Sequence, residues 1–190
     1  MTREMKEDGI KKAGDGRLAE GQWISQKKQP GLYRCHYYPI GGSIKPYKFR
    51  EIYDIIRDMD QVELRLSPDE SLYVINLTGR EAQKVQKVLS DGARTVFETS
   101  VACIGASICQ VGVRDSQKLL QSAVKAVRDA DLPDGVLPQI HISGCPSSCG
   151  THQIGAIGFR GGVKMIDKKP QPAFVLFYNG CDRQGRAQMG

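Results

Sequence analysis

The 190-residue sequence predicts an α+β fold built from two units. From residue 31 to about 90, strand-like and helix-like patterns follow one another in the order strand, helix, strand, strand, helix. From residue 93 on, one helical pattern is followed by four short strand patterns. Residues 1 to about 22 mix both charge signs without sustained periodicity, and the first strand pattern begins only at residue 31. We therefore expect a flexible arm over 1–30, a first domain over 31–92 and a second over 93–190.

The first unit reads as one sheet covered on one face by two helices. Strand formers fill residues 32–38, and Pro46 suits the first turn of a helix whose apolar positions run from 49 to 59. Residues 62–66 and 72–77 read as two strands joined by a turn. Thr78 and Glu81 have the spacing of a capping box, so a second helix is expected to begin there.

The second unit contains one predicted helix, capped by Asp115 or Ser116, with an apolar face that reaches Val127. A proline-containing turn follows at 131–135. Short strands are predicted at 139–143, 154–159, 163–166 and 174–178. This order of elements indicates a second α/β unit.

The composition limits which class of protein and which kinds of partner are expected. Hydrophobic residues make up 40% and charged residues 25%, which is typical of a soluble globular protein. The net charge of +6 favours an anionic partner. Basic and aromatic residues do not interleave in any one stretch, so nucleic acid is not expected. The sequence shows neither a signal-peptide pattern nor a membrane-span pattern, which predicts a cytoplasmic protein with no membrane partner.

Four of the six cysteines form two close pairs, Cys103 with Cys109 and Cys145 with Cys149. Structural zinc prefers a closer spacing than the first pair has, and disulfides require an oxidising compartment. An iron–sulfur cluster takes four thiolates, and small flanking residues let backbone amides approach its sulfurs. Glycine, alanine and serine flank these cysteines, which favours a cluster; zinc and unrelated thiols remain the alternatives. Outside the pairs, we expect a buried strand residue at Cys35 and an exposed thiol at Cys181.

The pattern Cys-x₅-Cys followed by Cys-x₃-Cys resembles the signature of the sirohaem- and [4Fe–4S]-containing nitrite and sulfite reductases. The text around both cysteine pairs is similar to that family, and so is the segment from Leu32 to Gly42. The resemblance spans about residues 31–180 and is closest to small single-unit sulfite reductases. It implies a ferredoxin-like half-domain over 31–92, followed by an α/β domain over 93–190 that binds the cluster and sirohaem.

The resemblance also implies roles for particular residues. Cys103, Cys109, Cys145 and Cys149 would ligate the cluster, and Cys149 would also bridge to the sirohaem iron. Arg34 matches an arginine that faces the substrate anion, and its planar fork of donors suits a sulfite or nitrite oxygen. Contacts to the cofactor are expected from Cys149, Arg34, Arg114 and His152. Further basic candidates for the carboxylates of sirohaem are Lys45, Lys48, Arg160 and Lys164.

The sequence departs from the family pattern at several points. The strand before the second cysteine pair lacks the Lys-x-Lys pair of two-unit members, and His141 is the candidate proton donor there. Ser147 stands where family loops often have asparagine. The chain holds one copy of a unit that is often present twice, and we expect its C-terminal end to be incomplete.

These observations predict a reductase that passes electrons from a donor protein, such as a ferredoxin, through the cluster to sirohaem and so reduces sulfite or nitrite. The alternative is a non-catalytic electron-transfer subunit that carries the same cofactors, and a zinc-stabilised binding module is a third reading. Two copies pairing as a homodimer would rebuild a two-unit pocket.

Overall fold

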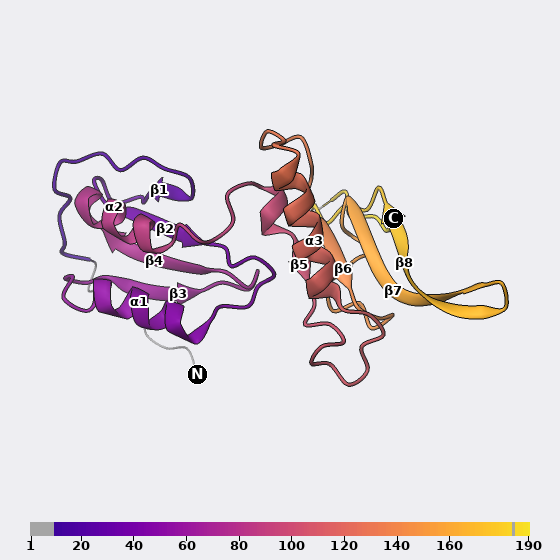
Figure 1. Cartoon of the computed structure of the whole chain (residues 1–190). Helices are drawn as coiled ribbons and strands as arrows, with labels where there is room; N and C mark the ends of the chain where they lie inside the picture. The colour runs from indigo at the N-terminus through magenta and orange to yellow at the C-terminus, as the bar shows by residue number, and fades with distance from the viewer. Residues whose placement is uncertain (1–9, 184) are drawn as a thin grey trace, which may run out of the picture. The chain divides into compact units, whose positions relative to one another are not determined.

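The computed structural model describes residues 10–183 and 185–190, and Figure 1 shows the chain. The chain divides into two compact units, each described by itself below. The first comprises the residues up to Pro39 together with Ser43–Gly92, and the second comprises Ile40–Gly42 with Ala93–Gly190. Within the described ranges, no helix is long and apolar enough to cross a membrane.

The first unit is an antiparallel sheet in the order β1-β2-β4-β3. The strands are β1 (Ile24–Gln26), β2 (Tyr33–Tyr37), β3 (Glu63–Leu66) and β4 (Leu72–Leu77), and the helices are α1 (Pro46–Ile56) and α2 (Gly79–Val88). The predicted order of strand, helix, strand, strand, helix is confirmed from β2 to α2. The α+β class predicted from the sequence is therefore correct.

Both helices of the first unit pack on one face of its sheet. Ile52 of α1 and Val85 of α2 are buried against Cys35 and Val74 of the strands. Because side chains alternate along a strand, the residues between them point to the other face. That second face carries Arg34 and Tyr73. It also holds a cavity, described below, and none of the residues that line this cavity belongs to α1 or α2.

The structure differs from the expected arm over residues 1–30. Residues 1–9 lie outside the described part, but Ile24–Gln26 form β1 and pair with β2. Lys12 Nζ forms an ion pair with Glu81 at 2.6 Å, and the Asp15 carboxylate accepts the amide hydrogens of Gly79 and Arg80. Residues 12–26 are therefore part of the first unit.

The second unit is a mixed sheet in the order β5-β6-β7-β8. Its strands are β5 (Val101–Ala102), β6 (Ile140–Ser143), β7 (Ile157–Ile166) and β8 (Lys169–Tyr178). The first three are parallel, and β8 pairs antiparallel to β7. A short 3-10 helix (Phe97–Thr99) precedes β5, and α3 (Ser116–Asp129) packs Leu120 and Val124 onto β6.

Two long strands replace three of the predicted strands. The sequence predicted strands at 154–159, 163–166 and 174–178, whereas β7 and β8 are ten residues each and form one hairpin, visible in Figure 1 as a ribbon whose tip projects away from α3. Strand β8 lies at the edge of the sheet and contains Pro170 and Pro172. Proline has no amide hydrogen, so it is found at strand positions that need no ladder bond from that amide.

Candidate functional site

The two cysteine loops meet because they leave neighbouring parallel strands at the same edge of the sheet. Cys103 follows β5 directly, and Cys145 lies two residues after the end of β6. The amide of Cys103 donates to the carbonyl oxygen of Ile142 at 3.0 Å, which extends the pairing of the two strands into the loops. The topology therefore brings together segments that are about forty residues apart in the sequence.

Three hydrogen bonds join the loops to one another. The amide of Gly144 donates to Cys103 Sγ at 3.1 Å, and the carbonyl oxygen of Gly144 accepts the amides of Val113 and Arg114 at 3.1 and 2.8 Å. The Ser116 hydroxyl lies 3.1 Å from the same sulfur. Cys103 thus already has the backbone donor that a cluster ligand needs.

Glycines make this close approach possible. A side chain at Gly144 would bring its Cβ within 2.5 Å of the Arg114 carbonyl oxygen, and one at Gly150 would reach 2.1 Å from that of Ile142. Gly105 has a positive φ of 73° in the first loop. The glycines noted in the sequence at 144 and 150 are therefore required by backbone contacts, one between the loops and one with β6.

The four thiols differ in exposure. Cys145 is buried, Cys103 and Cys109 are half-buried, and Cys149 is exposed. Hydrogen bonds from the Ser147 side chain and backbone lower the pKa of Cys145, against an opposing effect of burial. This favours the thiolate, which is the form that ligates metals. Ser147 is one of the positions at which the sequence was noted above to depart from the family pattern.

The structure brings the loops together without gathering the thiols around one point. None of the cysteines forms a disulfide, and within the described ranges no three His, Cys, Asp or Glu side chains are grouped so that they could hold a metal ion. The donor set nevertheless fits a [4Fe–4S] cluster, since it comprises four thiols on two hydrogen-bonded loops. The assignment of Cys103, Cys109, Cys145 and Cys149 as ligands stays a prediction.

His152 and His141 both lie near the second loop. The His152 ring is buried, with Nδ1 2.9 Å from Ser143 Oγ and the ring centre 4.7 Å from that of Phe177. Burial and the nearby Arg160 lower its pKa, which favours the neutral ring. His141 lies in β6 with Nδ1 2.8 Å from Thr151 Oγ1, and burial lowers its pKa as well. Each ring therefore has a hydroxyl partner within its own unit.

Arg114 and Lys48 are engaged in hydrogen bonds within their own units. Arg114 Nε donates to the Gly162 carbonyl oxygen at 3.0 Å, and Nη1 donates to that of Val113 at 2.8 Å. Lys48 is buried and forms ion pairs with Glu51 and Asp91. Lys48 is therefore not placed to meet a ligand. Of the other basic candidates, Lys45 and Lys164 are exposed, and Arg160 lies against the Phe177 ring.

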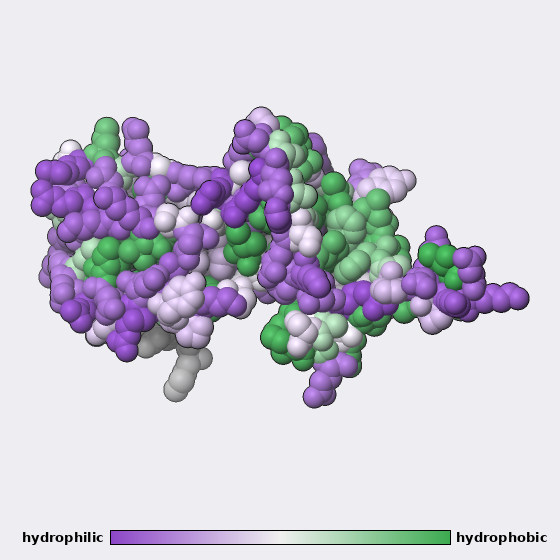
Figure 2. Space-filling view, viewed as in Figure 1, coloured by the Kyte–Doolittle hydropathy of each residue, from purple (hydrophilic) through white to green (hydrophobic). Residues whose placement is uncertain are grey.

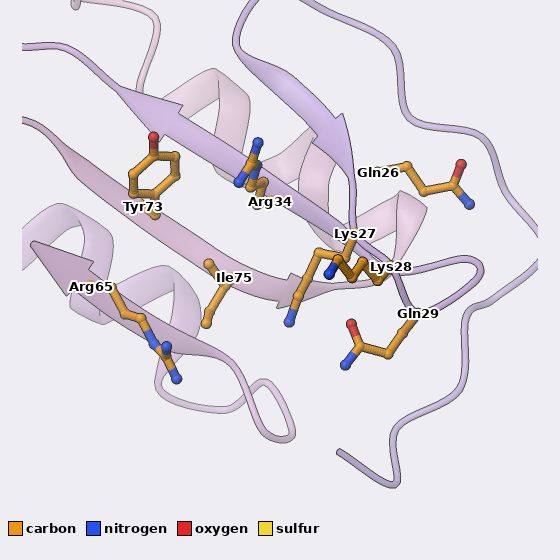
Figure 3. A pocket seen from close by; sticks show the side chains of 8 residues that line it. All are labelled: Gln26, Lys27, Lys28, Gln29, Arg34, Arg65, Tyr73 and Ile75. Atoms are coloured by element: carbon orange, nitrogen blue, oxygen red, sulfur yellow. The ribbon is translucent and has the colours of Figure 1, made fainter. Parts of the chain in front are cut away.

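Arg34 borders an open cavity of about 550 Å³ in the first unit, shown in Figure 3. Its Nε donates to Ser25 Oγ at 2.6 Å, and its guanidinium carbon lies 5.5 Å from the centre of the Tyr73 ring. We call this space the Arg34 cavity; its lining residues are Gln26, Lys27, Lys28, Gln29, Arg34, Arg65, Tyr73 and Ile75.

Sequence reasoning identified Arg34 but missed the three other cations of the cavity, Lys27, Lys28 and Arg65. Lys27 and Lys28 follow β1, the strand that was not predicted. Arg65 alternates with Leu64 and Leu66 in β3, so its face could have been predicted, but the pairing that brings β3 beside β4 could not.

Comparisons of sequence find relatives but no family model that matches the chain. The sulfite reductase [NADPH] hemoprotein beta-component of Bacillus licheniformis is 22% identical over 152 residues, covering 73% of this chain and 26% of the relative. The protein of the same description from Lysinibacillus sphaericus is 25% identical over 153 residues. The chain thus spans about a quarter of the length of the curated relatives it matches.

Solved structures share the fold. The NirA protein of Mycobacterium tuberculosis matches 88% of this chain and 32% of its own, with a TM-score of 0.72 and 20% identity. Dissimilatory sulfite reductase I matches 71% of this chain with a TM-score of 0.52 and 14% identity. In sequence and in fold, the chain resembles the nitrite and sulfite reductase family that its cysteine motifs indicated.

Proposed function

We propose that the chain is a reductase unit that binds a [4Fe–4S] cluster and sirohaem and reduces sulfite or nitrite in the cytoplasm. The observation that carries the proposal is the junction of the two cysteine loops, in which the Gly144 amide donates to Cys103 Sγ. The similarity to sulfite reductase hemoproteins and to NirA supports it. In this proposal, the first unit is the half-domain and the second binds the cluster.

Cys103, Cys109, Cys145 and Cys149 would hold the cluster. A cluster offers a separate iron to each thiolate, so the four sulfurs need only surround it, whereas a single zinc ion requires its sulfur ligands at about 2.3 Å. Cys149 is the most exposed of the four and would hold both the cluster and sirohaem. When bound, the two cofactors would supply the electrons for reduction of the oxyanion.

The chain's own residues would bind the anion and supply protons. Arg34 offers the guanidinium donors that its bond to Ser25 leaves free, a geometry suited to an oxyanion. His141, hydrogen-bonded to Thr151, is the proposed proton donor in the second unit. Arg114 and His152 would help to bind the cofactor. Arg114 is held by its hydrogen bond to the Gly162 carbonyl oxygen, and His152 by its contact with the Ser143 hydroxyl.

The test begins with anaerobic reconstitution of the purified chain. Iron and sulfide analysis and the visible spectrum should report a cluster coupled to sirohaem, and a viologen-linked assay should show turnover of sulfite or nitrite. Cys149→Ser should separate the haem and cluster spectra, whereas Cys181→Ser, at a cysteine outside the motif, should leave both unchanged. A protein that takes up only zinc would contradict the proposal.

A non-catalytic electron-transfer subunit is the second candidate. It is favoured by the missing Lys-x-Lys pair and by the engagement of His141 with Thr151. This candidate predicts the same spectra without turnover. Addition of a reduced ferredoxin, the proposed class of donor, would then reduce the cluster while sulfite and nitrite remain unconsumed.

A further inference from the structure

We infer that Ser116 and Gln117, the first two residues of α3, act together as positioning residues for Cys103. In the cluster-bound protein, the Ser116 hydroxyl donates a hydrogen bond to the Cys103 thiolate, and the Gln117 amide holds the Cys103 carbonyl oxygen so that the hydroxyl is free to do so. The inference rests on the proposed function, because Cys103 becomes a ligand only when the cluster is bound. It goes beyond that function by assigning two residues that set the reduction potential of the cluster.

Ser116 lies within reach of two acceptor atoms of the same cysteine. Its Oγ donates to the Cys103 carbonyl oxygen at 2.6 Å and lies 3.1 Å from Cys103 Sγ. Ser116 is fully buried, so its hydroxyl bonds within the protein. A hydroxyl carries one hydrogen and donates to one of these atoms at a time. While Cys103 is a thiol, the hydroxyl donates to the carbonyl oxygen and the sulfur donates its own hydrogen to Oγ.

Ligation of the cysteine reverses the donor that this contact needs. A cysteine binds iron as a thiolate, so the hydrogen on Cys103 Sγ is released to solvent when the sulfur–iron bond forms. The sulfur and Ser116 Oγ would then face each other at 3.1 Å with lone pairs on both sides. A hydroxyl hydrogen rotates to suit its acceptor, and a charged acceptor is preferred over a neutral one. The hydroxyl of Ser116 therefore turns from the carbonyl oxygen to the sulfur.

Gln117 supplies the donor that this rotation takes away. Its Nε2 donates to the Cys103 carbonyl oxygen at 3.1 Å, and it also donates to the carbonyl oxygens of Ala102 and Gly41, both at 2.9 Å. The two further carbonyl oxygens hold the amide group in place whichever way Ser116 points. The Cys103 carbonyl oxygen thus keeps a partner after the rotation, which avoids the free-energy cost of an unpaired buried acceptor.

The thiolate of Cys103 would then accept two hydrogen bonds, one from Ser116 and one from the Gly144 amide, which already lies 3.1 Å from the sulfur. The amide of Cys103 itself donates to the Ile142 carbonyl oxygen at 3.0 Å, so the backbone of this ligand is fixed as well. Hydrogen bonds to the sulfur ligands stabilise the negative charge that a cluster gains on reduction, and so raise its potential. Removal of the Ser116 donor should therefore lower the potential.

Redox titration of the reconstituted full-length protein, followed by electron paramagnetic resonance of the cluster, tests the inference. Ser116→Ala should lower the equilibrium constant for one-electron reduction about ten-fold, as the loss of a hydrogen bond to a charged acceptor predicts. This change corresponds to a fall of about 59 mV in potential. Ser122→Ala is the matched control, since this exposed hydroxyl of the same helix donates to the Lys118 carbonyl oxygen, and it should leave the potential unchanged.

Gln117→Met provides a second variant, with Ser116 still in place. Without the Gln117 amide, the Cys103 carbonyl oxygen keeps the Ser116 hydroxyl, so the potential should again fall. The double variant Ser116→Ala, Gln117→Met should have the same potential as Ser116→Ala alone, because Gln117 acts through the Ser116 hydroxyl. Iron and sulfide analysis and circular dichroism of each variant check that the cluster and the fold are retained.

The outcomes separate this inference from the proposed function. An unchanged potential in Ser116→Ala or in Gln117→Met, or additive shifts in the double variant, would overturn the inference even if the protein reduces sulfite or nitrite. A potential that falls in both single variants without further change in the double variant would support it, even if neither anion is reduced. A chain that takes up no cluster would overturn both.

Discussion

Lys48 is a buried cation whose partners all come from the first unit. Its Nζ lies 2.6 Å from Glu51 Oε2 and 3.0 Å from Asp91 Oδ2, and it donates to the Val88 carbonyl oxygen at 2.8 Å. The ring of Tyr37 lies beside it, with its centre 6.0 Å from Nζ. These contacts tie α1 to the C-terminal end of α2, so the charge of Lys48 has a structural role.

Lys48→Ala should lower the free energy of unfolding by about 1–3 kcal/mol, because it leaves a carbonyl oxygen and two carboxylates without their shared donor. The carboxylates are about half exposed, which keeps the loss below that of a fully buried pair. Urea denaturation of the apoprotein measures it. Lys45→Ala, at an exposed neighbour, should change stability by less than about 0.5 kcal/mol. Equal effects of the two substitutions would contradict the structural role.

His36 is held in an environment that disfavours its charged form. Its ring lies 3.8 Å from the rings of both Tyr38 and Tyr73, and Nε2 is 2.6 Å from the Ser71 hydroxyl. Burial lowers the pKa of His36 to about 4; Asp69 opposes this effect and Arg34 adds to it. The unfolded chain therefore binds a proton at this residue at a higher pH than the folded chain does.

Acidification should therefore destabilise the protein through His36. Its contribution to stability is fully present above the unfolded pKa of about 6.5 and is lost as the pH falls toward the folded pKa of about 4. Melting temperatures between about pH 7.5 and pH 5 should fall less steeply in His36→Gln than in the unsubstituted protein. Other histidines are present in both proteins, so the difference isolates His36. Parallel curves would show that its pKa is not lowered by folding.

The second cysteine loop depends on a glycine that contacts β6. A Cβ at Gly150 would lie 2.1 Å from the Ile142 carbonyl oxygen, so Gly150→Ala must displace the loop. We expect a loss of about 1–3 kcal/mol in stability, the usual cost of overpacking, and a lower yield of cluster on reconstitution. Gly162→Ala in β7 is the control, since no atom lies within 4 Å of its Cβ. Normal iron content in Gly150→Ala would show that the loop adapts.

The helices could be predicted from sequence because their signals are local. Thr78 and Glu81 form the expected capping box, with Glu81 Oε2 accepting the Thr78 amide at 2.8 Å. Asp115 caps α3 by accepting the Lys118 amide at 3.0 Å. Each cap depends on residues three apart in the chain, so no knowledge of tertiary structure was needed.

The strands were predicted less well because tertiary contacts decide them. Gly161 and Gly162 read as a break between strands, yet β7 continues through them. A Cβ at Gly161 would lie 2.2 Å from the Gly144 carbonyl oxygen, so glycine there permits close approach to the cysteine loop. Strand β1 has only three residues and is defined by its pairing with β2. Such pairings are not encoded in a local pattern.

Each unit has its own hydrophobic core, one built around Ile52 and Val85 and the other around Leu120 and Ile142. We therefore expect denaturant unfolding of the apoprotein to show two transitions. Lys48→Ala should shift only the transition of the first unit, and Gly150→Ala only that of the second. Tyrosine fluorescence and near-ultraviolet circular dichroism can follow both. One transition shifted by both substitutions would indicate a single cooperative unit.

The sequence predicted the meeting of the two cysteine loops better than it predicted the lining of the Arg34 cavity. The four cysteines lie in two short motifs, and parallel strands bring those motifs together without further information. The Arg34 cavity instead needs three separate segments, since Lys28, Arg34 and Arg65 meet only through the register of an antiparallel sheet. One residue of such a cavity can be recognised from a motif, whereas its neighbours can be identified only when the fold is known.

The two prolines of β8 have a consequence for self-association. Among the described residues, strand β8 pairs with β7 on one side only, so its other side is an open edge at which another chain could add a strand. Pro170 and Pro172 remove amide donors from that edge near the hairpin turn. The hairpin thereby resists fibril-like stacking, although it exposes apolar side chains, including Val163 and Met165. Figure 2 shows green, hydrophobic surface near the tip of the hairpin.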